Sequence, residues 1–215
     1  MKFLPMAAVA LLAACAGGPP PPEWQMNAHG AMERFVAAYM AGNTRVETAE
    51  FDKARSEIAR TGRSDLLARA ELLRCAARVA SLVVEPCEGF EKLRQDAPPA
   101  ERAYADYLSA KLQPQDLALL PAPQRAAAAA SADVAALNRI ADPLSRLVAA
   151  GVMFQAARAS PAVMALAVDT ASAQGWRRPL LAWLGLQARR AEQAGDPLEA
   201  ERLRRRMALV QGASG

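Results

Sequence analysis

The chain has 215 residues, of which 53% are hydrophobic and only 5% aromatic, and its formal net charge is +4. Charged residues make up 22% of the sequence, an ordinary share for a globular protein, which excludes wholesale disorder. Alanine is abundant and is the best helix former, so the composition favours closely packed helices over sheets.

The first fourteen residues have the pattern of an export signal. Lys2 supplies a short positive region, Phe3 to Leu12 an apolar region, and Ala13-Ala14 the small residues that a signal peptidase accepts. The apolar run is too short to cross a bilayer, which takes about 20 residues. We therefore expect residues 1–14 to be a signal peptide that is removed.

Leu12-Ala13-Ala14-Cys15 resembles the lipobox of bacterial lipoproteins. The resemblance implies that Cys15 carries diacylglycerol on its sulfur and an acyl chain on its new amino group. Two or more acyl chains hold a protein firmly on a membrane. By the same resemblance Ala16, which is not Asp, implies transfer to the outer membrane, where the protein faces the periplasm from the inner leaflet. The alternative is an ordinary secreted protein cut near Ala14.

A run of glycine and proline within residues 15–23 is interpreted as a tether, because proline gives an extended and stiff spacer. About 190 residues follow, which is enough for one sizeable core. An internal boundary is indicated by three prolines, Pro114, Pro121 and Pro123. We expect helical hairpins in residues 24–113 and 114–215, either as two units or as one continuous domain.

The first two predicted helices form an antiparallel hairpin. Helix-spaced apolar residues run from position 27 or 28 to position 41, where Gly42-Asn43 is a typical stop signal. Thr44, followed three residues later by Glu47, fits a capping box and predicts a second helix to about Arg60. Ser64 is expected to cap a third helix, and further helices are opened by Pro86 and Pro98-Pro99.

Two cysteines remain when Cys15 is lipidated, and an even remainder in an oxidising compartment predicts a disulfide between Cys75 and Cys87. A helix rises about 1.5 Å per residue, so Cys75 would lie far from a turn near Glu85-Pro86 if its helix ran straight to Val84. The bridge requires that this helix ends or bends early, near Val83-Val84. Otherwise both cysteines are buried thiols.

The second half is also helical in pattern. Ala126 to Ala130 indicates a helix, Asp142-Pro143 and Ser160-Pro161 each fit an N-cap followed by proline, and Gly175 fits a C-cap. Further helices are expected over residues 143–158, 161–174, 178–194 and 197–210. No stretch alternates with period two, so the predicted fold class is all-α.

Leu180 to Val210 resembles a tetratricopeptide repeat at the turn between the last two predicted helices. Gly195-Asp196 stands at the turn, Ala200 lies four residues beyond the aspartate, and Ala188 falls where that family has a small residue. Gln187, Ala191 and Arg204 replace large residues that are typical of the family. The resemblance implies hairpins stacked as an irregular α-solenoid, and divergent hairpins in a compact bundle are the alternative.

Positive charge gathers at the C-terminal end, where eight arginines face four acidic residues from Trp176 onward. Tryptophan and arginine are enriched in interface hot spots. The expected partner surface consists of Trp176, Arg177, Arg178, Arg202, Arg205 and Arg206. Glu201 is expected to pair with Arg205, four residues on. In the alternative interpretation Trp176 fills a joint between helices and the arginines are solvated.

Familiar catalytic and cofactor motifs are absent from the sequence. His29 is the only histidine, which removes most metal sites and the usual general base, and no Gly-rich phosphate loop or Gly-x-Ser-x-Gly elbow occurs. Glu85, Glu88 and Glu91 share a helical spacing, but basic residues are interleaved with them, which is typical of a solvated face. We expect no cofactor, no metal and no catalytic residue.

These observations favour a lipid-anchored periplasmic scaffold that binds a protein partner in the cell envelope, in assembly, secretion or cell-wall enzyme regulation. A nucleic-acid partner is excluded by the expected compartment, and no small-molecule substrate is evident. Two alternatives stay open: a carboxylate-dependent enzyme that acts on the cell wall, and a purely structural envelope protein.

Overall fold

A computed structural model describes residues 20–129 and 133–212 of the protein. These residues form helices and contain no strand, which confirms the predicted all-α fold class. The elements in chain order are α1 (Glu23–Ala41), α2 (Thr44–Ala59), α3 (Ser64–Ala80), α4 (Glu88–Glu91), α5 (Pro99–Leu108), the 3₁₀ helix η1 (Pro114–Leu119), α6 (Ala122–Ala128), α7 (Val134–Asn138), α8 (Pro143–Gln155), α9 (Pro161–Ala173), α10 (Arg177–Gln193) and α11 (Pro197–Gly212).

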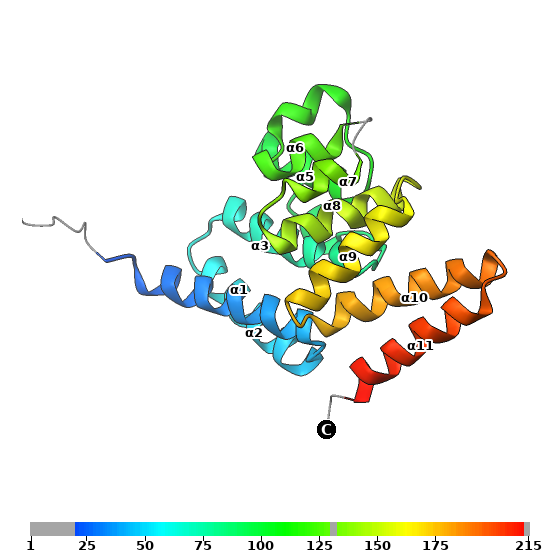
Figure 1. Ribbon diagram of the computed structural model, residues 1–215. Helices are drawn as coiled ribbons and strands as arrows, with labels where there is room; N and C mark the ends of the chain where they lie inside the picture. Colours follow the sequence, from blue (N-terminus) through cyan, green and yellow to red (C-terminus); the bar gives the residue numbers. More distant parts are fainter. Residues whose placement is uncertain (1–19, 130–132, 213–215) are drawn as a thin grey trace, which may run out of the picture.

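Two helical hairpins flank a central group of helices (Figure 1). The first turn of α1 projects at one end of the molecule, and the turn between α10 and α11 projects at the other. α1 packs along α2, and α10 packs along α11. α10 also contacts α9 and α1, so the second hairpin is joined to both the centre and the first hairpin.

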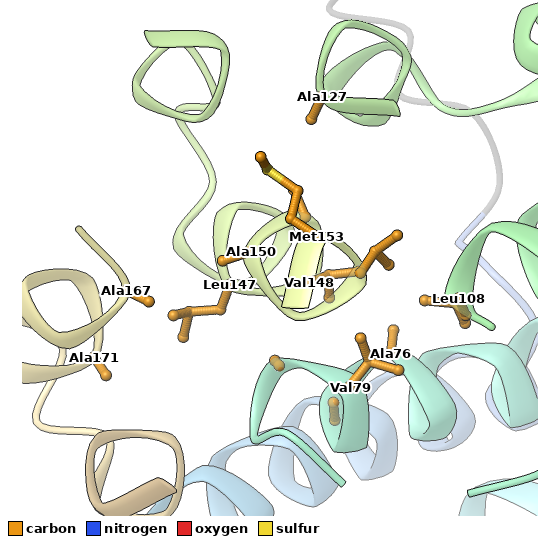
Figure 2. Close-up of a cluster of buried hydrophobic side chains, with 14 of the residues drawn as sticks. Ala76, Val79, Leu108, Ala127, Leu147, Val148, Ala150, Met153, Ala167 and Ala171 are labelled. Carbon is orange, nitrogen blue, oxygen red and sulfur yellow. The ribbon is translucent and has the colours of Figure 1, made fainter. Parts of the chain in front are cut away.

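Helix α8 is the centre of the fold. Every residue from Leu147 to Met153 is buried, because neighbouring helices surround this segment. Figure 2 shows α8 facing α9 through Ala167 and Ala171, α3 through Ala76 and Val79, α5 through Leu108 and α6 through Ala127. The many alanines on these facing surfaces allow the helix axes to approach closely.

α8 approaches α3 closely at Gly151. A Cβ atom at Gly151 would lie 2.3 Å from the backbone oxygen of Val79 and 2.9 Å from its Cγ1. Only a residue without a side chain fits between the two backbones at this point. Gly151 therefore fixes how deeply α8 sits on α3.

One main core draws side chains from both predicted halves of the chain, from Phe35 to Leu203. Trp183 of α10 is fully buried and its Nε1 donates a hydrogen bond of 3.0 Å to the backbone oxygen of Ala80. The two predicted groups of hairpins therefore share one hydrophobic core.

Several predicted helix ends are confirmed. Asp142 accepts a hydrogen bond from the Ser145 N–H at 2.7 Å, and Ser160 accepts one from the Val163 N–H at 3.3 Å. Gly175 follows α9 with a φ of +65°. Two other helix ends differ from the prediction. α1 begins at Glu23, four residues before the first predicted position. The alanine-rich helix ends at Ala128, because the backbone of Ala129 is extended.

The predicted capping box of α2 is wrong. The N-cap is Asn43, whose side chain accepts a hydrogen bond from the Val46 N–H at 3.2 Å. Glu47 does not reach back to the helix start, because its carboxylate is buried against arginines of other helices. Ser64 is likewise the first residue of α3 and not its cap.

Candidate functional site

A groove runs over α9, α10 and α11 and contains two of the arginines that the sequence singles out. Its volume is about 520 Å³. α9 contributes Met164, Val168 and Asp169 to the lining, and α10 contributes Gln187, Arg190 and Ala191. α11 contributes Glu199, Arg202, Leu203 and Arg206, which share one face of that helix at spacings of three and four residues.

The floor of the groove is apolar and rigidly held. Leu203 is 1% exposed and Val168 is 2% exposed, and both belong to the main core. Ala188 and Ala200 are buried between α10 and α11, so these helices pack closely beside the groove. The turn before α11 is fixed by Asp196, which accepts a hydrogen bond from the Glu199 N–H at 3.0 Å.

The charges of the groove are only partly neutralised within the protein. Arg202 donates two hydrogen bonds of 2.6 Å to the Glu199 carboxylate, and this contact lowers the pKa of Glu199. Within residues 20–129 and 133–212, Arg190 and Arg206 form no ion pair. The lining also contains Asp169 of α9, so the groove offers two guanidinium groups and one carboxylate above an apolar floor.

The arginines of α11 point in different directions. Arg202 and Arg206 line the groove, whereas Arg205 is exposed outside its lining. The predicted pair between Glu201 and Arg205 is wrong. Glu201 contacts Arg204 at 3.2 Å instead, and Arg204 also pairs with Glu192 of α10. Which residues pair depends on how α10 and α11 are rotated relative to each other. The spacing of residues within one helix does not specify this rotation.

Arg178 lies inside the junction between α10 and the first hairpin. Its guanidinium carbon is 4.1 Å from the centre of the Tyr39 ring, its Nη1 is 2.9 Å from Glu47 Oε2, and its Nη2 donates to Thr44 Oγ1 at 3.1 Å. Burial raises the pKa of Tyr39. These contacts make Arg178 a structural link between α10, α1 and α2.

The other two junction residues are also packed. Trp176 is half-buried against the main core, as the alternative interpretation of the sequence expects. Arg177 lies over Gly42, where a Cβ would meet its Nη2 at 3.2 Å. The six residues of the predicted surface therefore divide between this junction and α11, and only Arg202 and Arg206 line the groove.

The predicted disulfide between Cys75 and Cys87 is present, with a Cα–Cα distance of 5.9 Å. α3 ends at Ala80, and Leu82 reverses the chain with a φ of +59°. The following segment returns beside α3 and brings Cys87 next to Cys75. The early helix end that the bridge requires therefore occurs, just before Val83-Val84.

Two of the three carboxylates that the sequence offers for catalysis are paired with arginines. Glu85 contacts Arg78, and Glu91 contacts Arg94 at 2.7 Å. Glu88 is exposed. His29 is an exposed residue 3.3 Å from the Glu33 carboxylate. In the described part of the chain, no group of three or more His, Cys, Asp or Glu residues is arranged to hold a metal ion.

Three carboxylates whose burial the sequence does not indicate are buried in the fold, and each contacts an arginine from another helix. The pairs are Glu47 with Arg178, Glu71 with Arg55 at 3.0 Å and Glu101 with Arg69 at 2.5 Å. Their burial depends on long-range packing, so the local sequence gives no signal for it. Arg190 was missed as a groove residue for the same reason.

The predicted signal peptide, Cys15 and the first part of the predicted tether lie outside the described residues. Among the residues that the structure describes, none of the helices combines the length and apolar character needed to cross a bilayer. Comparisons with protein-family models, curated proteins and solved structures find no match.

Proposed function

We propose that this protein is a lipid-anchored periplasmic scaffold whose α9–α11 groove binds an acidic helical segment of an envelope protein. The lipobox-like sequence around Cys15 supports the anchor and the compartment. The single observation that carries the binding role is the combination of an apolar floor with two guanidinium groups, Arg190 and Arg206, that form no ion pair in the described residues.

The dimensions and position of the groove suit such a partner. Apolar side chains at helical spacing can contact Pro161, Met164 and Ala165, which line the groove and are not buried, while carboxylates on the flanks of the same helix reach the arginines. The groove also lies near the turn between α10 and α11, at the opposite end of the molecule from the first turn of α1 (Figure 1). An anchor at the N-terminus would leave this end accessible.

The binding role is tested by photo-crosslinking in cells from Gln187, a groove residue that carries no charge. The test compares Arg206→Glu with Arg205→Glu, because these neighbours have the same charge and only Arg206 lines the groove. Losing a desolvated charge pair costs about 2 kcal/mol or more, so Arg206→Glu should reduce the adduct at least about tenfold. Arg205→Glu should leave it unchanged.

The crosslinked peptide, mapped by mass spectrometry, should carry carboxylates at helical spacing. An adduct that survives Arg206→Glu, or that both variants abolish equally while remaining folded, contradicts the binding role. The anchor is tested separately by the mass of the N-terminal peptide. An unmodified Cys15, or residues 1–14 still attached, contradicts the lipid-anchored placement.

A further inference from the structure

A second apolar region lies at the tether end of the molecule. Ala28, Ile58 and Ala70 form a small buried cluster that is separate from the main core. Met32 and Leu66 pack on this cluster and are only partly buried. A groove of about 570 Å³ opens above it between α1, the end of α2 and the start of α3. We call it the Trp24 groove.

The rim of the Trp24 groove combines an aromatic ring with arginines. Trp24 stands in the first turn of α1 and is half-buried, and the nearby Met26 is 51% exposed. Arg63 and Arg69 lie on the α3 side, each paired with one carboxylate. An indole with an apolar body and one N–H donor prefers the boundary between hydrocarbon and water.

The apolar surface extends further along α3. A neighbouring groove of about 330 Å³ shares Arg69 and Leu73 with the Trp24 groove. It is lined by Tyr104 of α5 and by Leu119 of η1, which is 41% exposed. The two grooves together form one face of the molecule on both sides of Arg69.

The short tether between Cys15 and Trp24 would hold this face close to the membrane. Trp24 follows Cys15 by nine residues, and a fully extended chain of that length spans at most about 30 Å. A surface held this close to a bilayer meets it at a high effective concentration, so modest apolar contact is enough to dock it. A partner arriving from the periplasm would have no such advantage.

We propose that the Trp24 groove is a membrane-contact site that docks on the phospholipid leaflet carrying the lipid anchor. Trp24 and Met26 enter the interface, and Arg63 and Arg69 lie at the level of the phosphate groups. This inference rests on the proposed lipid anchoring. It assigns the two ends of the molecule different tasks, with membrane contact near α1 and partner binding near the α10–α11 turn.

The test uses the full-length lipidated protein in vesicles of phosphatidylethanolamine and phosphatidylglycerol, with or without bromine on the acyl chains. Bromine quenches the fluorescence of tryptophans that reach the bilayer. The chain has three tryptophans, and Trp183 is fully buried. We expect brominated vesicles to quench part of the wild-type emission. Trp24→Phe should remove this quenching, whereas the matched control Trp176→Phe should retain it.

Equal quenching of wild type and Trp24→Phe, or no quenching of the wild type, overturns the membrane-contact site. An unquenched Trp24 whose emission shifts to the blue with protein concentration indicates a second copy on the groove and also overturns it. The mass of the N-terminal peptide separates the two proposals. If Cys15 is acylated and Trp24 is not quenched, the membrane contact fails alone, whereas an unmodified Cys15 contradicts both.

Discussion

Replacing Gly151 with alanine tests whether the contact between α8 and α3 determines stability. The added Cβ would lie 2.3 Å from the Val79 backbone oxygen, so one of the two helices must shift. Overpacking of a core costs about 3 kcal/mol at the upper end of its usual range, and alanine in place of glycine regains about 1 kcal/mol of helix propensity. The expected net loss is about 2 kcal/mol.

A loss of this size lowers the melting temperature of a domain of this length by about 4 to 8 °C. Gly185→Ala in α10 is the matched control, because its Cβ would find Met207 Cε at 3.6 Å, an ordinary contact. That variant should be neutral or up to about 1 kcal/mol more stable. Both are measured by thermal and urea unfolding followed by circular dichroism. If Gly151→Ala melts at or above the wild-type temperature, the reasoning about helix approach is refuted.

Three further predictions concern polar and covalent links. Arg178→Ala leaves the buried Glu47 carboxylate without its closest partner. The free energy of unfolding, measured with urea, should fall by about 3 kcal/mol. A fall below about 1 kcal/mol would contradict the role of Arg178 as a structural link between α10, α1 and α2. Burial raises the pKa of Glu71 in the folded state, so its contribution to stability is full at low pH and falls as the pH rises through that pKa. Glu71→Gln should therefore gain stability relative to wild type between pH 4 and pH 7, and a constant difference over this range would argue against the shift. Reduction of the Cys75–Cys87 bridge, with a sequence separation of 12, should cost about 3 kcal/mol and lower the melting temperature by about 6 to 12 °C. An unchanged melting temperature after confirmed reduction would contradict this.

The sequence was most informative where structure is determined locally. Asp142 and Ser160 cap their helices as predicted, since an N-cap side chain bonds to an N–H three residues away. Cys75 and Cys87 were paired correctly from the count of cysteines, since two remain when Cys15 is set aside, and α3 ends early as the bridge requires. These signals do not depend on how distant helices pack.

Predictions from the sequence were wrong where a side chain can pair with either a local or a distant partner. Glu47 fits a capping box in sequence, but Arg178 lies far along the chain and provides a stronger, charged partner at 2.9 Å. Because of this long-range contact, Arg178 lies at the junction of α10 with α1 and α2. It is therefore not free to form the partner surface that the sequence predicted. Arg206, a candidate from the sequence, lines the groove, but the position of its companion Arg190 depends on the rotation of α10, which helical periodicity alone does not fix.

The central place of α8 has a consequence for the order of events during synthesis. The faces of α3 and α5 that α8 covers belong to the first half of the chain, while α8 itself lies beyond residue 142. A chain synthesised from its N-terminus leaves those faces open to chaperones, proteases and aggregation until the later segment emerges. A nonsense mutation upstream of α8 would leave a remnant that lacks the buried segment from Leu147 to Met153.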